Sequence, residues 1–135
     1  MNILVCVKRV PATTIRVAVQ DGKRLNPDGV EFLLNPYDEY AVEEALRRKE
    51  SAGTGKVVAL SLGTTDAQKE LRQVLAMGVD EAVLLTHAEA GFADGATTAR
   101  LLETEIRKRG PFDLLFFGKQ AVDRDQHGVG PMVAT

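Results

Sequence analysis

The sequence predicts an α/β fold: a parallel sheet with flanking helices and a β-hairpin insertion after the first strand. Four short apolar runs do not alternate with polar residues, which is typical of strands buried on both faces. They span 3–7, 57–61, 82–85 and 114–117. The last three runs are about 25 and 32 residues apart, which fits βαβ units.

Amphipathic patterns with their own start and stop signals predict three helices, over 36–52, 66–77 and about 96–109. Asn35 is the expected N-cap of the first helix, with Pro36 as its first residue. A second interpretation of Asn35 is that its amide bonds a ligand. Thr65 and Gln68 have the spacing of a capping box, and Gly78 stands where the second helix should end.

The hairpin is indicated by a segment that does not follow the βαβ rhythm. Ile15, Val17 and Val19 alternate with polar or small residues, and the Asp-Gly dipeptide at 21–22 favours a type I′ turn. The sequence Asn-Pro-Asp-Gly at 26–29 then predicts a further turn.

Composition limits the class of protein. The 135 residues suit one domain, over 1–135, and carry a net charge of −2 with 5% aromatic residues and no Trp, which argues against nucleic-acid binding. One cysteine allows no internal disulfide. No apolar stretch approaches the length of a membrane span, and the chain begins directly on a strand without a signal peptide. We therefore expect a cytoplasmic protein with no membrane insertion.

The end of the chain is unusual for this fold. Pro131 is the expected first residue of a fourth helix, yet only four residues follow it. Since a last parallel strand normally has a covering helix, we expect these residues to be the N-terminal part of a longer chain.

Ligands of open α/β sheets bind beyond the carboxyl ends of the strands, where strand order reverses. The segments that follow the strands, 8–11, 61–65 and 118–131, are therefore the candidates. In the last of these, Gly128 and Gly130 permit close backbone approach, and the free N–H groups of the next helix favour a phosphate. An ordinary glycine-containing loop explains the same residues.

No catalytic or metal-binding constellation is apparent. Asp123 and Asp125 lie in a loop with basic neighbours, which favours a solvated loop over a metal site. His87 and His127 lack the spacing of metal ligands and are expected on the surface. Cys6, inside a strand, is expected to be a buried core thiol.

Several motifs stand together in order along the chain: VKRVP at 7–11, NPYDEYAVEEA at 35–45, LAMGVD at 75–80, GKQAVD at 118–123 and VGP at 129–131. Together they resemble the beta subunit of electron transfer flavoprotein, and the resemblance covers essentially the whole chain. That subunit is about twice as long, so the chain is similar to its N-terminal part.

The resemblance implies a Rossmann-like nucleotide-binding domain without catalytic residues of its own. It also implies an alpha subunit that holds most of the FAD, and AMP in the beta subunit, replaced by a second FAD in bifurcating members. The implied electron donors are flavin dehydrogenases such as acyl-CoA dehydrogenases, and the implied acceptor is a quinone oxidoreductase. Carried over by position, the nucleotide-binding residues are Cys6, Asn35, Pro36, Tyr37, Asp38, Leu62, Gly118, Lys119, Gln120, Ala121, Val122, Asp123, Arg124, Asp125, Gln126, His127, Gly128 and Val129.

The chain departs from the family pattern where the phosphate is expected. The family often continues Gly-Asp-Thr after the aspartate at 123, whereas this chain has Arg124, Asp125 and Gln126. A hydroxyl is thereby lost at 126 and a cation gained at 124. We expect the phosphate against the backbone of residues 128–132 and the adenine toward Asn35.

Two other functions fit the same architecture. The first is a stand-alone ATP- or AMP-binding regulatory module of universal-stress type, which should carry a longer glycine-spaced phosphate loop. The second is an adenylating hydrolase, which should have a Ser-Gly-Gly-x-Asp-Ser loop after the first strand. Residues 8–11 read Lys-Arg-Val-Pro instead.

Overall fold

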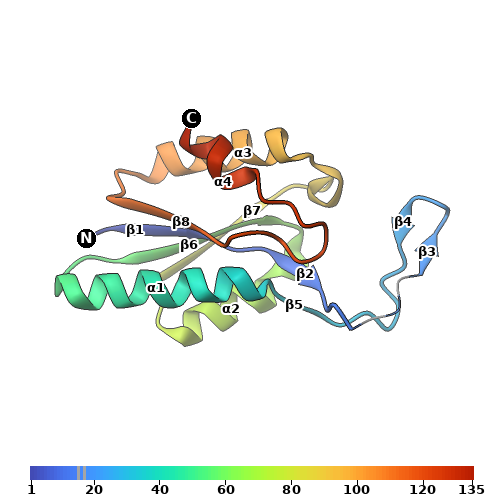
Figure 1. Cartoon of the computed structure of the whole chain (residues 1–135), viewed down its shortest axis with the longest axis horizontal. Helices are drawn as coiled ribbons and strands as arrows, with labels where there is room; N and C mark the ends of the chain where they lie inside the picture. The colour runs from blue at the N-terminus through green and yellow to red at the C-terminus, as the bar shows by residue number, and fades with distance from the viewer. Residues whose placement is uncertain (15, 17) are drawn as a thin grey trace.

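A four-stranded parallel sheet forms the middle layer of the protein (Figure 1). The structure is a computed structural model that describes residues 1–14, 16 and 18–135. The strands are β1 (Ile3–Cys6), β6 (Val57–Gly63), β7 (Glu81–Thr86) and β8 (Leu114–Phe117). All four predicted strands are confirmed, and the second extends to Gly63.

Helices cover both faces of this sheet, as the sequence predicted. On one face α1 (Pro36–Ala52) and α2 (Gln68–Met77) pack against Ile3 and Val5 of β1. On the other, α3 (Gly95–Arg109) and the short α4 (Val129–Ala134) pack around the cluster that contains Leu4 and Cys6. Successive β1 side chains therefore enter opposite cores, which explains why the run is apolar throughout.

The strand order places the reversal point of the sheet between β1 and β8. The order is β7-β6-β1-β8. After β1 the chain adds β6 and β7 on one side of it, and β8 then pairs with β1 on the other side. The ends of β1 and β8 are level, because Cys6 pairs with Phe117. This is the Rossmann-like arrangement, in which ligands bind at the carboxyl ends of the strands beside the reversal.

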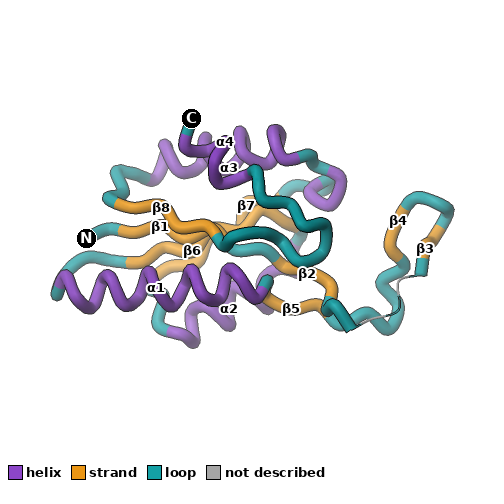
Figure 2. Tube along the Cα trace, viewed as in Figure 1, coloured by secondary structure: helices purple, strands orange, loops and turns teal. Residues whose placement is uncertain are grey.

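An arm projects from the carboxyl edge of the sheet (Figure 2). Its stem is the antiparallel pair β2 (Arg9–Pro11) and β5 (Phe32–Leu34), and its tip is the hairpin of β3 (Val19–Gln20) and β4 (Arg24–Leu25). Asp21 and Gly22 have φ values of 53° and 65°, which confirms the predicted type I′ geometry. The predicted alternation at Ile15 and Val17 lies outside the described residues.

Two predicted helix starts are wrong. Thr65 belongs to η1 (Thr65–Ala67), a 3₁₀ turn without a side-chain cap, and α2 begins only at Gln68, so the capping box does not form. Helix α4 begins at Val129, so Pro131 is its third residue and not its first. Proline is tolerated there because the N–H groups of a first turn have no helical acceptor. Gly78 ends α2 as predicted, at a φ of 116°.

A buried ion pair joins the stem of the arm to α2. The Nε of Arg9 lies 3.4 Å from Oε2 of Glu70, whose side chain is only 3% exposed. The Arg9 guanidinium also lies 3.7 Å from the centre of the Phe32 ring. Neither Glu70 oxygen makes a hydrogen bond, so the nearby positive charge is what compensates the buried carboxylate.

Replacing Arg9 with Met should therefore lower the free energy of unfolding by about 3 kcal/mol or more, because Glu70 would remain buried without its counter-charge. The double variant Arg9→Met/Glu70→Met should be closer to wild type than Arg9→Met alone. Denaturant unfolding of the three proteins measures both effects. Additive losses in the double variant would show that the two side chains are not coupled.

Candidate functional site

The loop after β8 forms a strap across the carboxyl edge of the sheet. We define the strap as residues 118–128, which connect β8 to α4. Its contacts reach the start of α1 on one side and the start of α3 on the other. In Figure 2 the same loop extends beyond the strand ends, beside β2, before it turns back to α4. The strap therefore lies over the reversal point.

Asn35 holds the first half of the strap. Its side chain is buried, and its Nδ2 donates to the carbonyl of Gln120 at 2.9 Å, while its Oδ1 accepts the N–H of Val122 at 3.1 Å. Asn35 stands before α1, as predicted, but its side chain makes no capping bond to the helix. Both ends of the carboxamide pair with strap backbone, so the Asn35 side chain holds the strap and does not cap the helix.

Lys8 and Asp38 secure the adjacent end of β1. The Nζ of Lys8 lies 2.8 Å from Oδ2 of Asp123, and the Lys8 N–H donates to Oδ2 of Asp38 at 2.8 Å. The backbone of Gly118 also donates to the Asp38 carboxylate. One buried carboxylate at the start of α1 thus joins the end of β1 to the beginning of the strap.

Gly118 passes so close to α1 that a side chain would not fit. A Cβ at this position would meet the N–H nitrogen of Asp38 and the carbonyl carbon of Tyr37, both at 2.8 Å, as well as the Asp38 carboxylate. Backbone cannot move aside as a flexible side chain can. The glycine after β8 is therefore required by the close approach of the strap to the helix.

The second half of the strap contacts the opposite side of the edge. The Nη2 of Arg124 donates to the carbonyl of Gly91 at 2.7 Å, in the turn η2 (Ala90–Phe92). The side chain of Gln126 lies against Gly95, at the start of α3, where a Cβ would displace it. These two contacts tie the strap to the segment between β7 and α3.

Burial dominates the electrostatics of this edge. It raises the pKa of the Asp38 carboxyl to about 6, although hydrogen bonds from Asn35, from the Lys8 backbone and from the Gly118 backbone, and the Lys8 charge, all act to lower it. Burial, and to a smaller extent the charge of Asp38, raises the pKa of the Cys6 thiol far above its usual range. Cys6 is thus a protonated core thiol, as predicted.

The structure brings most of the predicted site residues together at this edge. Cys6 ends β1, Tyr37 lies under the Nζ of Lys119 at 5.9 Å from its ring centre, and Leu62 lies near the end of β6. His127 is exposed, as expected. Pro36 is the first residue of α1, and its side chain is exposed.

Not every residue of 128–132, the segment expected to bind the phosphate, can donate a backbone N–H to it. The N–H of Met132 already donates to the carbonyl of Gly128, and Pro131 has no N–H to offer. The amides of Val129 and Gly130 are in the first turn of α4, where a helix supplies no acceptor. An anion beside Gly128 would therefore be met by these amides.

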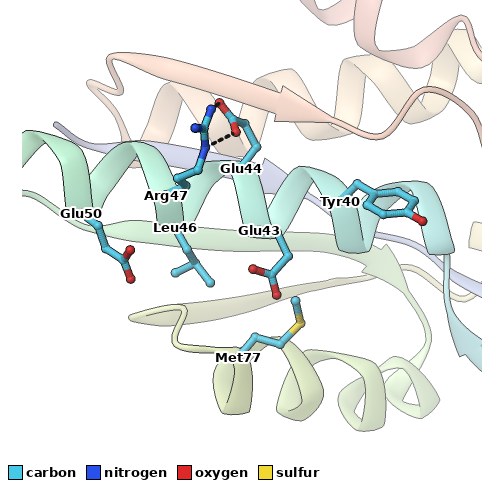
Figure 3. Close-up of a pocket in the computed structure, with 7 residues that line it drawn as sticks. All are labelled: Tyr40, Glu43, Glu44, Leu46, Arg47, Glu50 and Met77. Atoms are coloured by element: carbon cyan, nitrogen blue, oxygen red, sulfur yellow. Dashed lines mark hydrogen bonds and ion pairs between the residues drawn. The ribbon is translucent and has the colours of Figure 1, made fainter.

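A depression of about 390 Å³ lies between α1 and α2, away from the strap (Figure 3). Leu46 and Met77 lie between the two helices, and Glu43 and Glu50 extend from the same side of α1 (Figure 3). Carboxylates repel phosphate, so this depression does not suit a nucleotide, and we do not include it in the site.

The described residues contain neither a cluster of metal-ligating side chains nor a helix suited to a membrane crossing. No group of three or more His, Cys, Asp or Glu side chains within residues 1–14, 16 and 18–135 is placed to hold a metal ion. In the same ranges, none of the helices has both the length and the apolar character that a membrane crossing requires.

Sequence reasoning missed three residues of this edge. In the sequence, Lys8 belongs to the candidate segment 8–11 and to the VKRVP motif but has no predicted role of its own. Gly91 and Gly95 belong to none of the candidate segments. The available signal was position, because Gly91 and Gly95 follow β7 as the other candidates follow β1, β6 and β8. Gly91 contacts Arg124 and Gly95 contacts Gln126, each more than 30 residues further along the chain, so no local sequence pattern reveals these contacts.

Comparison with known proteins decides the family. Residues 24–135 match the family model described as the electron transfer flavoprotein domain. The chain belongs to the electron transfer flavoprotein family. The match covers the strap, Asn35 and strands β6, β7 and β8, so it includes the motifs at 35–45 and 118–123 that contribute residues to the site just described.

Individual relatives agree with this family. The chain is 45% identical over 134 residues to the electron transfer flavoprotein subunit beta of Thermoanaerobacterium thermosaccharolyticum, covering 99% of this chain and 51% of that protein. It is 40% identical over 136 residues to the acryloyl-CoA reductase electron transfer subunit gamma of Anaerotignum propionicum, with the same coverage. It is 38% identical over 135 residues to the caffeyl-CoA reductase-Etf complex subunit CarD of Acetobacterium woodii, again with 99% and 51% coverage. The chain thus spans about half the length of these relatives.

Protonation of Asp38 should make the fold more stable as pH falls from 7 toward 5. The folded-state pKa of about 6 lies above the ordinary 3.8, so the folded state binds the proton more tightly and gains about 1 kcal/mol of stability between pH 7 and pH 5. Urea unfolding of wild type and Asp38→Asn across this range measures the gain, which the Asn variant should lack.

Below this range the stability of the fold should decrease as pH falls. Glu44, Asp80 and Asp94 have lowered pKa values, and their favourable interactions are lost on protonation. If the difference between wild type and Asp38→Asn did not change between pH 7 and pH 5, the assignment of this titration to Asp38 would be wrong.

Proposed function

We propose that this protein is a nucleotide-binding subunit of an electron transfer flavoprotein, and that it binds AMP beneath the strap. In this proposal it acts in the cytoplasm as the N-terminal part of a beta subunit, paired with an alpha subunit that holds most of the FAD. The subunit carries no catalytic residues of its own. It shapes the complex, while the flavin supplies the redox chemistry.

The observation that carries the proposal is the strap over the reversal point of the sheet. Open α/β sheets bind nucleotides at this place, and the strap is fixed there by Asn35, Lys8 and Asp38. The residues suit an adenylate, since the amides of Val129 and Gly130 lie in the first turn of α4, where they could donate to a phosphate, and apolar side chains end the neighbouring strands. The carboxamide of Asn35 is already paired, so we propose that it positions the strap beside the adenine.

The alternative to AMP in this proposal is a second FAD, which the resemblance implies for bifurcating members of the family. The adenylate half of FAD has the same chemistry, so the nucleotide itself must be identified after release. The names of two relatives connect those proteins with acryloyl-CoA and caffeyl-CoA reductases. For this chain we propose flavin dehydrogenases, such as acyl-CoA dehydrogenases, as electron donors and a quinone oxidoreductase as the acceptor, as the family resemblance implies.

Family membership also favours this function over a stand-alone regulatory module of universal-stress type. The two functions differ in a simple observation, because the proposed subunit purifies in a yellow heterodimer and the regulatory module as a colourless homodimer.

Replacing Gly128 with Asp should weaken AMP binding about ten- to hundredfold, or about 1–3 kcal/mol, because a carboxylate would face the phosphate. Gly128→Ala is the matched control, since a Cβ there meets only the flexible end of Met132, at 3.3 Å. His127→Ala should also have little effect, as the side chain is exposed. Calorimetric titration of AMP into the full-length heterodimer, after removal of its nucleotide, measures the affinities. Normal affinity in Gly128→Asp would contradict this placement of the phosphate.

Gly130→Asp is a poorer test of the same idea. A Cβ at Gly130 would meet the Phe117 ring at 3.2 Å, so this change would disturb packing as well as charge.

A further inference from the structure

The two halves of the strap are held by contacts of different kinds. In residues 118–123 the fixed points are the buried Asn35 side chain and the part-buried ion pair of Lys8 with Asp123. In residues 124–128 the side-chain hydrogen bonds are exposed to solvent, foremost the bond from Arg124 to the Gly91 carbonyl, and one backbone bond, from the Ala121 N–H to the Gln126 carbonyl at 3.0 Å, joins the two halves. Water competes for exposed hydrogen bonds, so the second half is the part that opens more readily.

The backbone of this second half is also less relaxed than that of the first. Asp125 has a φ of 52°, in the left-handed region that non-glycine residues occupy at a cost. Its carboxylate accepts one exposed bond, from Nε2 of Gln120 at 2.9 Å. Within the strap, residues 124–128 are thus held by this bond and by the backbone bond from Ala121 to Gln126, and the remaining support comes from contacts to other elements.

The turn that receives Arg124 is itself supported from another direction. The guanidinium of Arg24, at the tip of the arm, lies 5.2 Å from the centre of the Phe92 ring. Gly91 and Phe92 both belong to η2. The strap contacts this turn at the Gly91 carbonyl, and the arm contacts it at the Phe92 ring. It is a fixed point to which a mobile segment can attach.

We propose that Arg124 is a positioning residue that latches the second half of the strap onto η2 and thereby slows nucleotide exchange at the crevice. The inference rests on the proposed nucleotide site and extends it. The Arg124 guanidinium bonds a carbonyl oxygen of η2, so its positive charge is engaged there and not at the phosphate. Opening needs only the release of residues 124–128, while Asn35 keeps residues 118–123 in place.

A latch and a direct phosphate contact have different kinetic effects. Loss of a latch accelerates both entry and release of the nucleotide and changes the Kd little. Loss of a phosphate contact accelerates release alone and weakens the Kd by the same factor. The two rates together therefore identify the role of Arg124.

The test uses the full-length heterodimer, freed of nucleotide, with 1,N6-etheno-AMP as a fluorescent probe in stopped-flow experiments. Arg124→Ala should raise both the association and the dissociation rate about tenfold and leave the Kd within about threefold. Arg124→Lys should restore slow exchange in part, since an ammonium can still donate to the Gly91 carbonyl. Arg72→Ala, which removes an exposed arginine on α2, is the control and should match wild type.

Hydrogen exchange of the nucleotide-free protein separates this inference from the proposed function. In Arg124→Ala, amides of residues 124–128 should exchange faster, and so should the Ala121 amide, which donates to the Gln126 carbonyl, while the Val122 amide, which donates to Asn35, should not change. Unchanged exchange of residues 124–128 and Ala121, or a weakened Kd with an unaltered association rate, would overturn the latch. A wild-type heterodimer that binds no etheno-AMP would overturn the proposed function, and the exchange data would still decide whether Arg124 holds the strap.

Discussion

The carboxamide of Asn35 is the contact on which the candidate site depends. It joins the start of α1 to backbone groups of Gln120 and Val122, 85 and 87 residues further along the chain. Asn35 is 1% exposed, so an unpaired amide there would cost about 1–3 kcal/mol for each lost partner. The helix start and the strap therefore stabilise each other only when both are in place. Gly118 permits this approach, because a larger residue would collide with the backbone of α1.

A buried carboxylate beside this contact brings an electrostatic cost. Asp38 is charged at neutral pH only because backbone N–H groups and Lys8 offset part of its desolvation. Lys8 also pairs with Asp123, so the charges at the edge are largely matched within the protein. The resulting edge is rigid near β1 and weakly held near η2. Such an asymmetry suits a subunit that keeps a nucleotide for a long time and still has to acquire it.

The sequence was sufficient for the elements whose causes are local. Both-face burial identified the four strands, apolar periodicity identified α1, α2 and α3, and Asp21 with Gly22 identified the turn of the arm. It was insufficient where a residue's partner is distant in the chain. A helix start explained Asn35 fully, so its bonds to the strap were not anticipated, and the Arg9–Glu70 pair has no local signature. The family resemblance identified which segments belong to the edge. The structure was needed to show the contacts of each residue, such as those of Asn35 with the strap and of Arg124 with η2.

The most direct test of this account is the nucleotide content of the full-length heterodimer in wild type and Asn35→Ala. Nucleotide and flavin are released by denaturation and measured separately, and Asn26→Ala in the arm serves as the matched control, because the Asn26 side chain accepts only an exposed N–H, from Asp28. Wild type and Asn26→Ala should contain about one AMP per beta chain. Asn35→Ala should lose most of its AMP and keep its flavin, which shows that the complex still assembles. Full AMP content in Asn35→Ala would contradict the claim that this side chain holds the strap over the nucleotide.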